Sequence, residues 1–149
     1  MKQSIKRIYV DTNVLNNFCT GIGKDTEVLS YIFKKRRKEL LFTSSLAVVQ
    51  TITNLQTNKR GRKAYSKEET ISRLNKLLPK FTFIDLKIDD VVNAYNEKGK
   101  DLEDCVHYEL CKKANCEAIL TNNTSDFALF DVIKISPAMK LRAIKSIIS

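Results

Sequence analysis

The stretch I-Y-V-D-T-N-V-L-N, at residues 8–16, decides the fold class of this chain. Its first three residues are apolar and β-branched or aromatic, a composition typical of a short buried strand. The polar run Asp11-Thr12-Asn13 then ends the strand and supplies a helix N-cap, and apolar residues recur at helical spacing beyond it. The chain therefore opens with a strand, a polar turn and a helix.

The same alternation of strand and helix continues along the rest of the chain. Strands separated by helices favour right-handed βαβ crossovers. No linker, repeat or low-complexity stretch interrupts the pattern. We therefore expect an α/β fold, one domain over residues 1–149, with a mostly parallel central sheet flanked by helices. Further strands are expected at 40–43, 81–86, 118–120 and 132–135, and helices over 25–38, 46–55, 66–77, 89–96 and 101–113, with a last short helix from Pro137.

Charge and cysteine content narrow the function classes. Lysine and arginine number 26 and aspartate and glutamate 17, so the formal net charge is +9. A surplus of this size suits a polyanionic partner, although it also serves solubility. The four cysteines form no C-x-x-C pair, and a single histidine cannot complete a zinc finger. With no signal peptide or membrane-spanning run, these features predict a cytoplasmic protein without a membrane partner.

Carboxylates follow the expected strands at several points. Asp11 follows the first strand, and Asp126 follows the strand at 118–120. Asp101 and Asp104 lie one turn apart at a helix start. Ligands of parallel sheets bind beyond the carboxyl ends of the strands, and Mg²⁺ and Mn²⁺ relieve the repulsion of clustered carboxylates. Helix capping, the helix dipole and turn formation are simpler roles for the same residues, and spacing alone leaves both interpretations open.

Three motifs, in this order, resemble those of the PIN domain family, especially its VapC-like bacterial group. The opening I-Y-V-D-T-N-V-L-N is similar to the family's first motif, a hydrophobic strand followed by D-T-N-V/I-L. D-L-E-D-C-V-H-Y, at 101–108, is similar to D-F-E-D-A-L-Q-Y. A-I-L-T-N-N-T-S-D-F, at 118–127, is similar to I-x-T-R-N-x-x-D-F. Each motif is weak alone, but the ordered set spans nearly the whole chain.

The resemblance implies a compact α/β fold and a Mg²⁺- or Mn²⁺-dependent endoribonuclease, the toxin of a toxin–antitoxin pair. It carries the metal-binding and catalytic roles onto Asp11, Asp104 and Asp126. The implied partners are RNA, an acidic antitoxin protein and a second copy of the chain. Supporting roles are expected for Thr12, Asn13, Gln50, Asp101 and Asn123.

The chain departs from the family's pattern at two positions. Gln50 stands where many PIN domains have a glutamate, and Asn123 stands where many have an aspartate. Both replacements keep a carbonyl oxygen but remove a charge, which lowers the expected metal affinity. A catalytically weak or inactive module that binds RNA or protein is therefore the alternative. A phosphatase with an aspartate nucleophile is disfavoured, because Asn13 cannot act as the general acid–base that such an enzyme needs.

Two further features concern partners and packing. Basic runs lie at 34–38 and 59–63, and the second offers Lys59, Arg60, Arg62 and Lys63 as nucleic-acid contacts, with a solvated surface as the alternative. On the helix at 101–113, Leu102 is expected to face inward with later apolar residues. His107, on the same helix, is expected to have a structural or surface role rather than a catalytic one.

Overall fold

A five-stranded parallel sheet forms the centre of the computed structural model, which describes residues 4–35 and 40–148. The strand order is β3-β2-β1-β4-β5, and every neighbouring pair is parallel. β1 is central, with Ile8 opposite both Leu41 and Ala118. The expected α/β class is confirmed. The strands are β1 (Ile8–Val10), β2 (Leu41–Ser44), β3 (Thr82–Ile84), β4 (Ala118–Leu120) and β5 (Ile133–Ile135).

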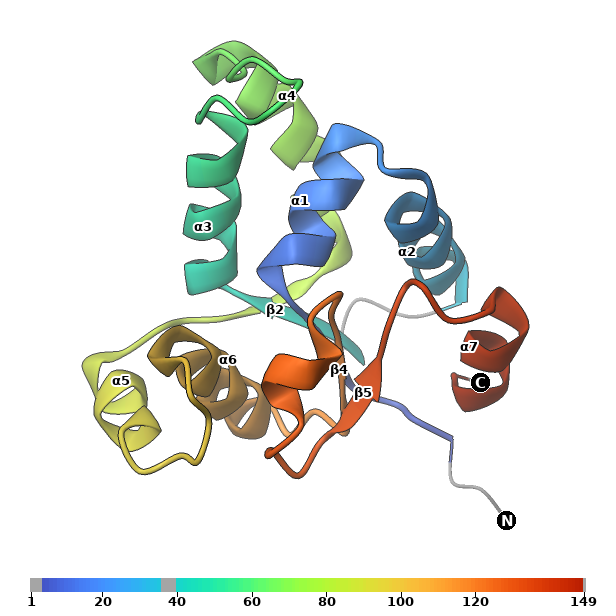
Figure 1. Cartoon of the computed structure of the whole chain (residues 1–149). Coiled ribbons are helices and arrows are strands. Elements are labelled where there is room, and N and C mark those ends of the chain that lie inside the picture. The colour runs from blue at the N-terminus through green and yellow to red at the C-terminus, as the bar shows by residue number, and fades with distance from the viewer. Residues whose placement is uncertain (1–3, 36–39, 149) are drawn as a thin grey trace.

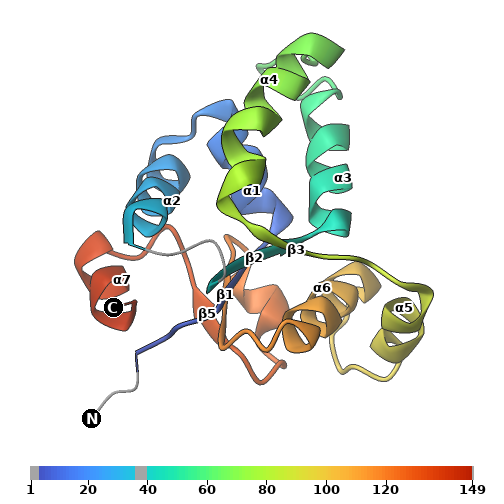
Figure 2. The same ribbon diagram turned by 180° about the vertical axis from the view of Figure 1, so that it is seen from behind.

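Helices cover both faces of the sheet (Figures 1 and 2). Ile8 and Val10 point into a core shared with α1, α2, α3, α4 and α7, whereas Tyr9 points into the core under α5 and α6. This division follows from the two-residue period of a strand. The helices are α1 (Thr12–Thr20), α2 (Gly23–Lys35), α3 (Ser45–Leu55), α4 (Lys67–Leu77), α5 (Ile88–Ala94), α6 (Leu102–Lys113) and α7 (Leu141–Ile147), with short 3₁₀ helices η2 (Leu78–Lys80) and η3 (Thr124–Phe127).

Local capping signals place several of these helices. Asp11 is the N-cap of α1, and its side chain accepts the backbone N–H of Thr12. Ser66 and Glu69 form the expected capping box of α4. Asp101 caps α6 by accepting the N–H of Asp104 at 3.0 Å. Of these three caps, Asp11 and Asp101 also line the cavities of the site described below.

Three sequence predictions are wrong in detail. The last helix begins at Leu141 rather than Pro137, because Ser136 and Met139 close a turn first. The strand expected at 81–86 is shortened to β3, since η2 occupies the residues just before Phe81. Leu102 is 49% exposed rather than inward, because the first turn of α6 lies at the rim of the core.

The basic run at 34–38 falls partly outside the described residues, so its arrangement as a whole is not defined. Within the described ranges, no helix is long and apolar enough to cross a membrane.

Candidate active site

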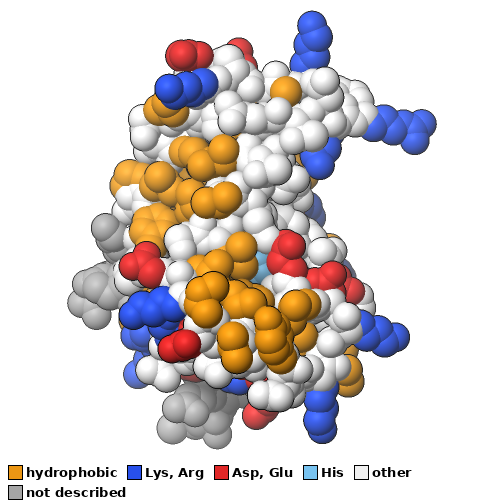
Figure 3. All heavy atoms as spheres, turned by 90° about the vertical axis from the view of Figure 1, so that its left-hand side faces the viewer, with side chains coloured by type: hydrophobic (Ala, Val, Ile, Leu, Met, Phe, Trp, Pro, Cys, Tyr) orange, Lys and Arg blue, Asp and Glu red, His pale blue; other side chains and the backbone are white. Residues whose placement is uncertain are grey.

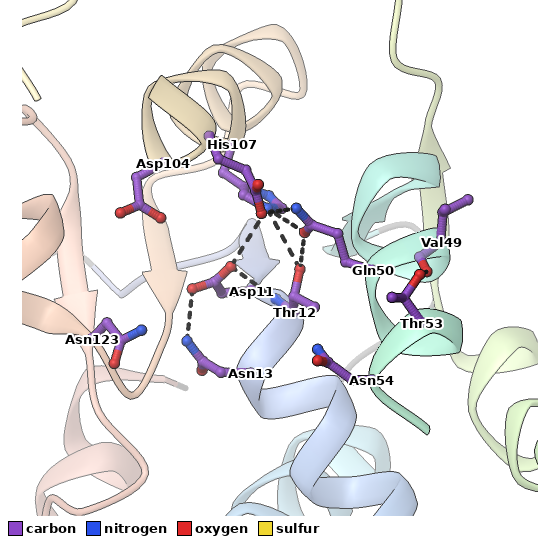
Figure 4. Close-up of a pocket in the computed structure, with 11 residues that line it drawn as sticks. Asp11, Thr12, Asn13, Val49, Gln50, Thr53, Asn54, Asp104, His107 and Asn123 are labelled. Atoms are coloured by element: carbon purple, nitrogen blue, oxygen red, sulfur yellow. Dashed lines mark hydrogen bonds and ion pairs between the residues drawn. The ribbon is translucent and has the colours of Figure 1, made fainter. Parts of the chain in front are cut away.

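A polar cavity of about 440 Å³ opens beyond the carboxyl ends of β1 and β4. Asp104 and Asn123 lie on one side of it, Gln50 and Thr53 on the other, and Asp11 at its base (Figure 4). Four separate segments of the chain therefore meet here: the start of α1, the outer face of α3, the first turns of α6 and the loop after β4. The lining residues are Asp11, Thr12, Asn13, Val49, Gln50, Thr53, Asn54, Glu103, Asp104, His107 and Asn123.

Asp11 is held firmly at the base of this cavity. Its side chain is buried, and one carboxylate oxygen accepts the backbone N–H of Thr12 at 2.8 Å. The other oxygen accepts the Asn13 amide at 3.0 Å and the Thr121 hydroxyl at 2.8 Å. Hydrogen bonds of this kind hold the carboxylate in one orientation. The expected support from Thr12 and Asn13 is therefore present in the geometry, and Thr121 is an additional donor that sequence reasoning missed.

Asp104 lies in the first turn of α6 and faces the same cavity (Figure 4). Burial, together with the negative charges of Asp101, Asp11, Asp126 and Glu103, raises the pKa of Asp104 to about 7. No lysine or arginine is among the described residues that line the cavity. The carboxylates of this site thus repel one another without a cationic side chain to offset them.

Asp126 lies on η3 and lines a second, adjoining cavity rather than the first. Asp104 lines both cavities and forms the wall between them, while Asp101 faces only the second. The structure therefore brings Asp11, Asp104 and Asn123 together in one cavity. It places Asp101 and Asp126 next to them, close enough for their charges to affect the pKa of Asp104.

The donor chemistry of the first cavity suits a hard divalent cation. The carboxylates of Asp11, Asp104 and Glu103 and the amide oxygen of Asn123 are oxygen ligands of the type that Mg²⁺ and Mn²⁺ take up. Within the described part of the chain, no three side chains among His, Cys, Asp and Glu lie close enough to coordinate one ion directly. The arrangement thus fits an ion that keeps several waters and is bound through one or two carboxylates, as Mg²⁺ commonly is.

Among the lining residues that sequence reasoning did not assign to the site, His107 and Glu103 make polar contacts with Gln50. His107 is only 2% exposed, and its Nε2 atom lies 2.9 Å from the Gln50 Oε1 atom and 3.9 Å from a carboxylate oxygen of Asp11. Glu103 accepts a hydrogen bond from the Gln50 Nε2 atom. The spacing from Asp104 to His107 is three residues, which places both on one face of α6 and was a signal available in the sequence.

The imidazole of His107 is neutral in this setting. Burial lowers the pKa of His107, and this effect outweighs the opposing influence of the Asp11 charge. The side chain therefore serves as a hydrogen-bonding group in the wall of the cavity. This agrees with a structural role, although the residue lies inside the site and not on the surface.

A basic hairpin tip joins α3 to α4 above this cavity. Lys59, Arg60 and Lys63 are exposed there, and Lys59 pairs with Arg62 across the turn. Arg62 differs from the other three, because its guanidinium donates to the carbonyls of Asn54 and Leu55 at the end of α3. Figure 3 shows lysine and arginine side chains projecting at this end of the molecule, with acidic side chains beside the histidine lower down.

The aromatic ring of Tyr65 holds the base of this hairpin. The guanidinium carbons of Arg62 and Arg73 lie 4.6 Å and 4.0 Å from its centroid. Such cation–π contacts stabilise the two arginines where they are. Lys59, Arg60 and Lys63 are therefore the residues of the run that remain available to a nucleic acid.

Comparisons with known proteins place the chain in a family. A family model described as the PIN domain matches residues 8–132. DNA-bound VapBC from Salmonella typhimurium matches with a TM-score of 0.66 and 10% identity, over 89% of this chain and 98% of that one. A toxin–antitoxin complex from Klebsiella pneumoniae matches with a TM-score of 0.65 and 18% identity, over 89% and 99%.

A third solved structure, the sarcin–ricin loop cleaving toxin VapC20 of Mycobacterium tuberculosis, has a TM-score of 0.59 and 13% identity, over 84% of this chain and 98% of that one. No curated protein matches the sequence. Identities this low show a shared fold, and the family model covers most of the chain. The chain belongs to the PIN domain family.

Proposed function

We propose that this protein is a Mg²⁺- or Mn²⁺-dependent endoribonuclease that cleaves RNA phosphodiester bonds. The observation that carries the proposal is the convergence of Asp11 and Asp104 on one cavity beyond the sheet, where burial and the neighbouring negative charges raise the pKa of Asp104 to about 7. A divalent cation bound in this cavity would offset the repulsion between the carboxylates, and PIN domains are typically metal-dependent nucleases.

Each residue of the site has a role in this proposal. Asp11 and Asp104 hold the metal ion directly or through water, and Asn123 orients a water or the ion from the opposite loop. When bound, the ion supplies an activated water as the nucleophile and neutralises charge on the phosphate. Asp126 and Asp101 act from the adjoining cavity, through water or by setting the local charge.

RNA approaches this site along α3 in our proposal. Gln50, Thr53 and Asn54 form a polar wall that runs from the cavity toward the basic hairpin tip. Lys59, Arg60 and Lys63 at that tip bind phosphates, since cationic side chains gain affinity by releasing counterions from the RNA backbone. Replacing all three with alanine should weaken RNA binding and reduce its salt dependence by a slope of roughly 2, at about 0.7 per phosphate contact on a single strand.

The partners follow from the solved structures of similar fold. Several of these are toxins crystallised with their antitoxins, and one is described as cleaving the sarcin–ricin loop. We propose that this chain is likewise the toxin of a pair, neutralised by an acidic antitoxin that matches its net charge of +9.

Exposed apolar side chains on α3 and α5 support association with a second copy. Val49, Ile88 and Tyr95 are exposed, and hydrophobic side chains gather over this side of the molecule (Figure 3). Patches of this kind mark association surfaces more often than free surface. Light scattering at several protein concentrations measures the oligomeric state; a monomer at all of them would contradict this part of the proposal.

The decisive experiment compares RNA cleavage with metal binding. The purified chain should cleave labelled single-stranded or structured RNA with Mn²⁺ and should lose that activity in EDTA. Asp11→Asn should abolish cleavage, whereas Asp89→Asn, which changes an exposed aspartate on α5, should leave it unchanged. Undiminished cleavage by Asp11→Asn would overturn the assignment of the site. Failure to bind Mn²⁺ at millimolar concentration in calorimetry would favour the inactive module.

A further inference from the structure

A buried hydrogen-bonded chain runs from the start of α3 to the wall of the cavity. The Tyr9 hydroxyl lies 2.7 Å from the Ser44 Oγ atom and 2.8 Å from the His107 Nδ1 atom. The other ring nitrogen of His107 lies 2.9 Å from the Gln50 Oε1 atom. Residues 9, 44, 50 and 107 come from β1, β2, α3 and α6, so these hydrogen bonds connect four elements that meet at the site.

The directions of these hydrogen bonds are determined by the groups that take part. Tyr9 is fully buried, and its hydroxyl has Ser44 Oγ and His107 Nδ1 as hydrogen-bond partners. The Glu103 carboxylate only accepts, so the Gln50 NH₂ group faces it and the Gln50 carbonyl accepts from His107 Nε2. A neutral imidazole then accepts at Nδ1, so the Tyr9 hydroxyl donates to Nδ1 and accepts from the Ser44 hydroxyl. With Nδ1 as the acceptor, a neutral imidazole carries its proton on Nε2.

The proton on Nε2 in turn helps to hold the Gln50 amide in this orientation. Gln50 Oε1 accepts from the Thr12 hydroxyl at 2.6 Å and from His107 Nε2. The opposite amide orientation would place two donors against each other at His107 and two acceptors against each other at Glu103. The Gln50 NH₂ group therefore faces Glu103 and donates a hydrogen bond to its carboxylate.

We propose that Tyr9 and His107 are positioning residues that hold the Gln50 amide in one orientation and thereby bring the Glu103 carboxylate into the acidic cavity. Glu103, on α6, is then a further acidic group of the site. It supplies a negative charge beside Gln50, whose own side chain is neutral. The expected effect of these residues on RNA cleavage rests on the proposed nuclease function. The hydrogen-bond directions and the tautomer of His107 do not depend on that function.

The single histidine of the chain makes the first test direct, because its ring nitrogens give the only imidazole signals. Nitrogen-15 NMR of the metal-free protein should show one tautomer with the proton on Nε2. Tyr9→Phe removes the hydroxyl and should produce a mixture of tautomers. Tyr108→Phe is the matched control, since Tyr108 lies next to His107 on α6 but is stacked on Phe130, and its substitution should leave the tautomer unchanged. An unchanged tautomer in Tyr9→Phe would overturn the proposal.

The second test asks whether the network positions Glu103. Tyr9→Phe and Glu103→Gln should each reduce kcat for RNA cleavage roughly 10-fold with little change in KM, and the double variant should lose little more, because the two act through one network. His107→Gln, which can still accept from Tyr9 and donate to Gln50, should retain most activity, whereas His107→Leu should not. Additive losses in the double variant would overturn the role of Glu103.

These results separate the two proposals. If the native chain shows the Nε2 tautomer, and Tyr9→Phe loses it, but no RNA is cleaved, then the nuclease function is wrong and the hydrogen-bonded network stands. If the native chain cleaves RNA and Tyr9→Phe changes neither the tautomer nor kcat, the nuclease stands and the positioning role is wrong. Thermal melting of every variant shows whether a loss reflects unfolding.

Discussion

Asp11 and Asp126 follow neighbouring strands of the sheet, yet they lie in opposite surroundings. Asp11 comes directly after β1, is 4% exposed and accepts hydrogen bonds from three donors. Asp126 lies on η3, beyond the loop that follows β4, and is exposed in the adjoining cavity. Two residues that the family motifs make equivalent in importance therefore differ in how firmly the fold holds them.

The different surroundings of Asp11 and Asp126 suit the two carboxylates to different roles. Buried hydrogen bonds fix the position of the Asp11 carboxylate, so that little reorganisation would be required for it to bind a metal ion. An exposed carboxylate on a short 3₁₀ turn can adjust when an ion or RNA arrives. Asp104, which lines both cavities, links the two.

Substitution of the two aspartates should give the largest contrast. We expect Asp11→Asn to reduce Mn²⁺-dependent RNA cleavage by at least about 100-fold, and Asp126→Asn by roughly 10-fold, the lower end of the loss typical of an outer-shell partner. The reason is that Asp11 offers a fixed ligand, whereas Asp126 acts from the neighbouring cavity. Single-turnover cleavage rates measure both. Equal losses would show that the comparison is wrong and that Asp126 is a direct ligand.

Removal of the Thr121 hydroxyl group, which donates to Asp11, should have a smaller effect, and this effect should be confined to the cavity that contains Asp11. Thr121 is buried and donates to Asp11, so Thr121→Ala should destabilise the protein by about 1.5–3 kcal/mol, the usual range for a hydrogen bond to a charged group. It should also weaken Mn²⁺ binding about 10-fold. Ser125→Ala, an exposed position in the second cavity, is the control and should change neither. Urea unfolding and calorimetry test both quantities.

The smallest effect concerns Asp104, which lines both cavities. The pKa of Asp104 is raised from its ordinary 3.8 to about 7, so ionisation of this group costs the metal-free folded state stability as pH rises from about 4 to 7. Asp104→Asn should therefore raise the Tm at pH 8 by roughly 2 °C, after allowance for solvent screening, and should leave it unchanged near pH 4.

Melting in EDTA at both pH values measures this difference, with Asp89→Asn as the exposed control. Saturating Mn²⁺ should reverse the order at pH 8, because the native protein gains stability from the ion and the variant does not. A Tm that falls in Asp104→Asn without metal would show that the carboxylate is stabilised in this fold, and not repelled.

Local signals in the sequence were sufficient for much of the fold, including the strand end that places Asp11 at the cavity. The apolar strand before Asp11, the capping box of α4 and the cap at Asp101 each depend on neighbours within a few residues, and each is present in the structure. The parallel sheet followed from the alternation of strands and helices. The prediction for Pro137 was wrong because a turn and a helix start share the same local signal.

The sequence by itself determined that Asp11 caps a helix at the carboxyl end of a buried strand, since that position depends only on local periodicity and capping. Only the tertiary structure decided that Asp126 faces a separate cavity, that Arg62 is used to end α3, and that His107 meets Tyr9 across 98 positions of sequence. These relations depend on how α3, α6 and the strands pack against one another. Strand register and helix packing set distances between side chains that no local pattern encodes.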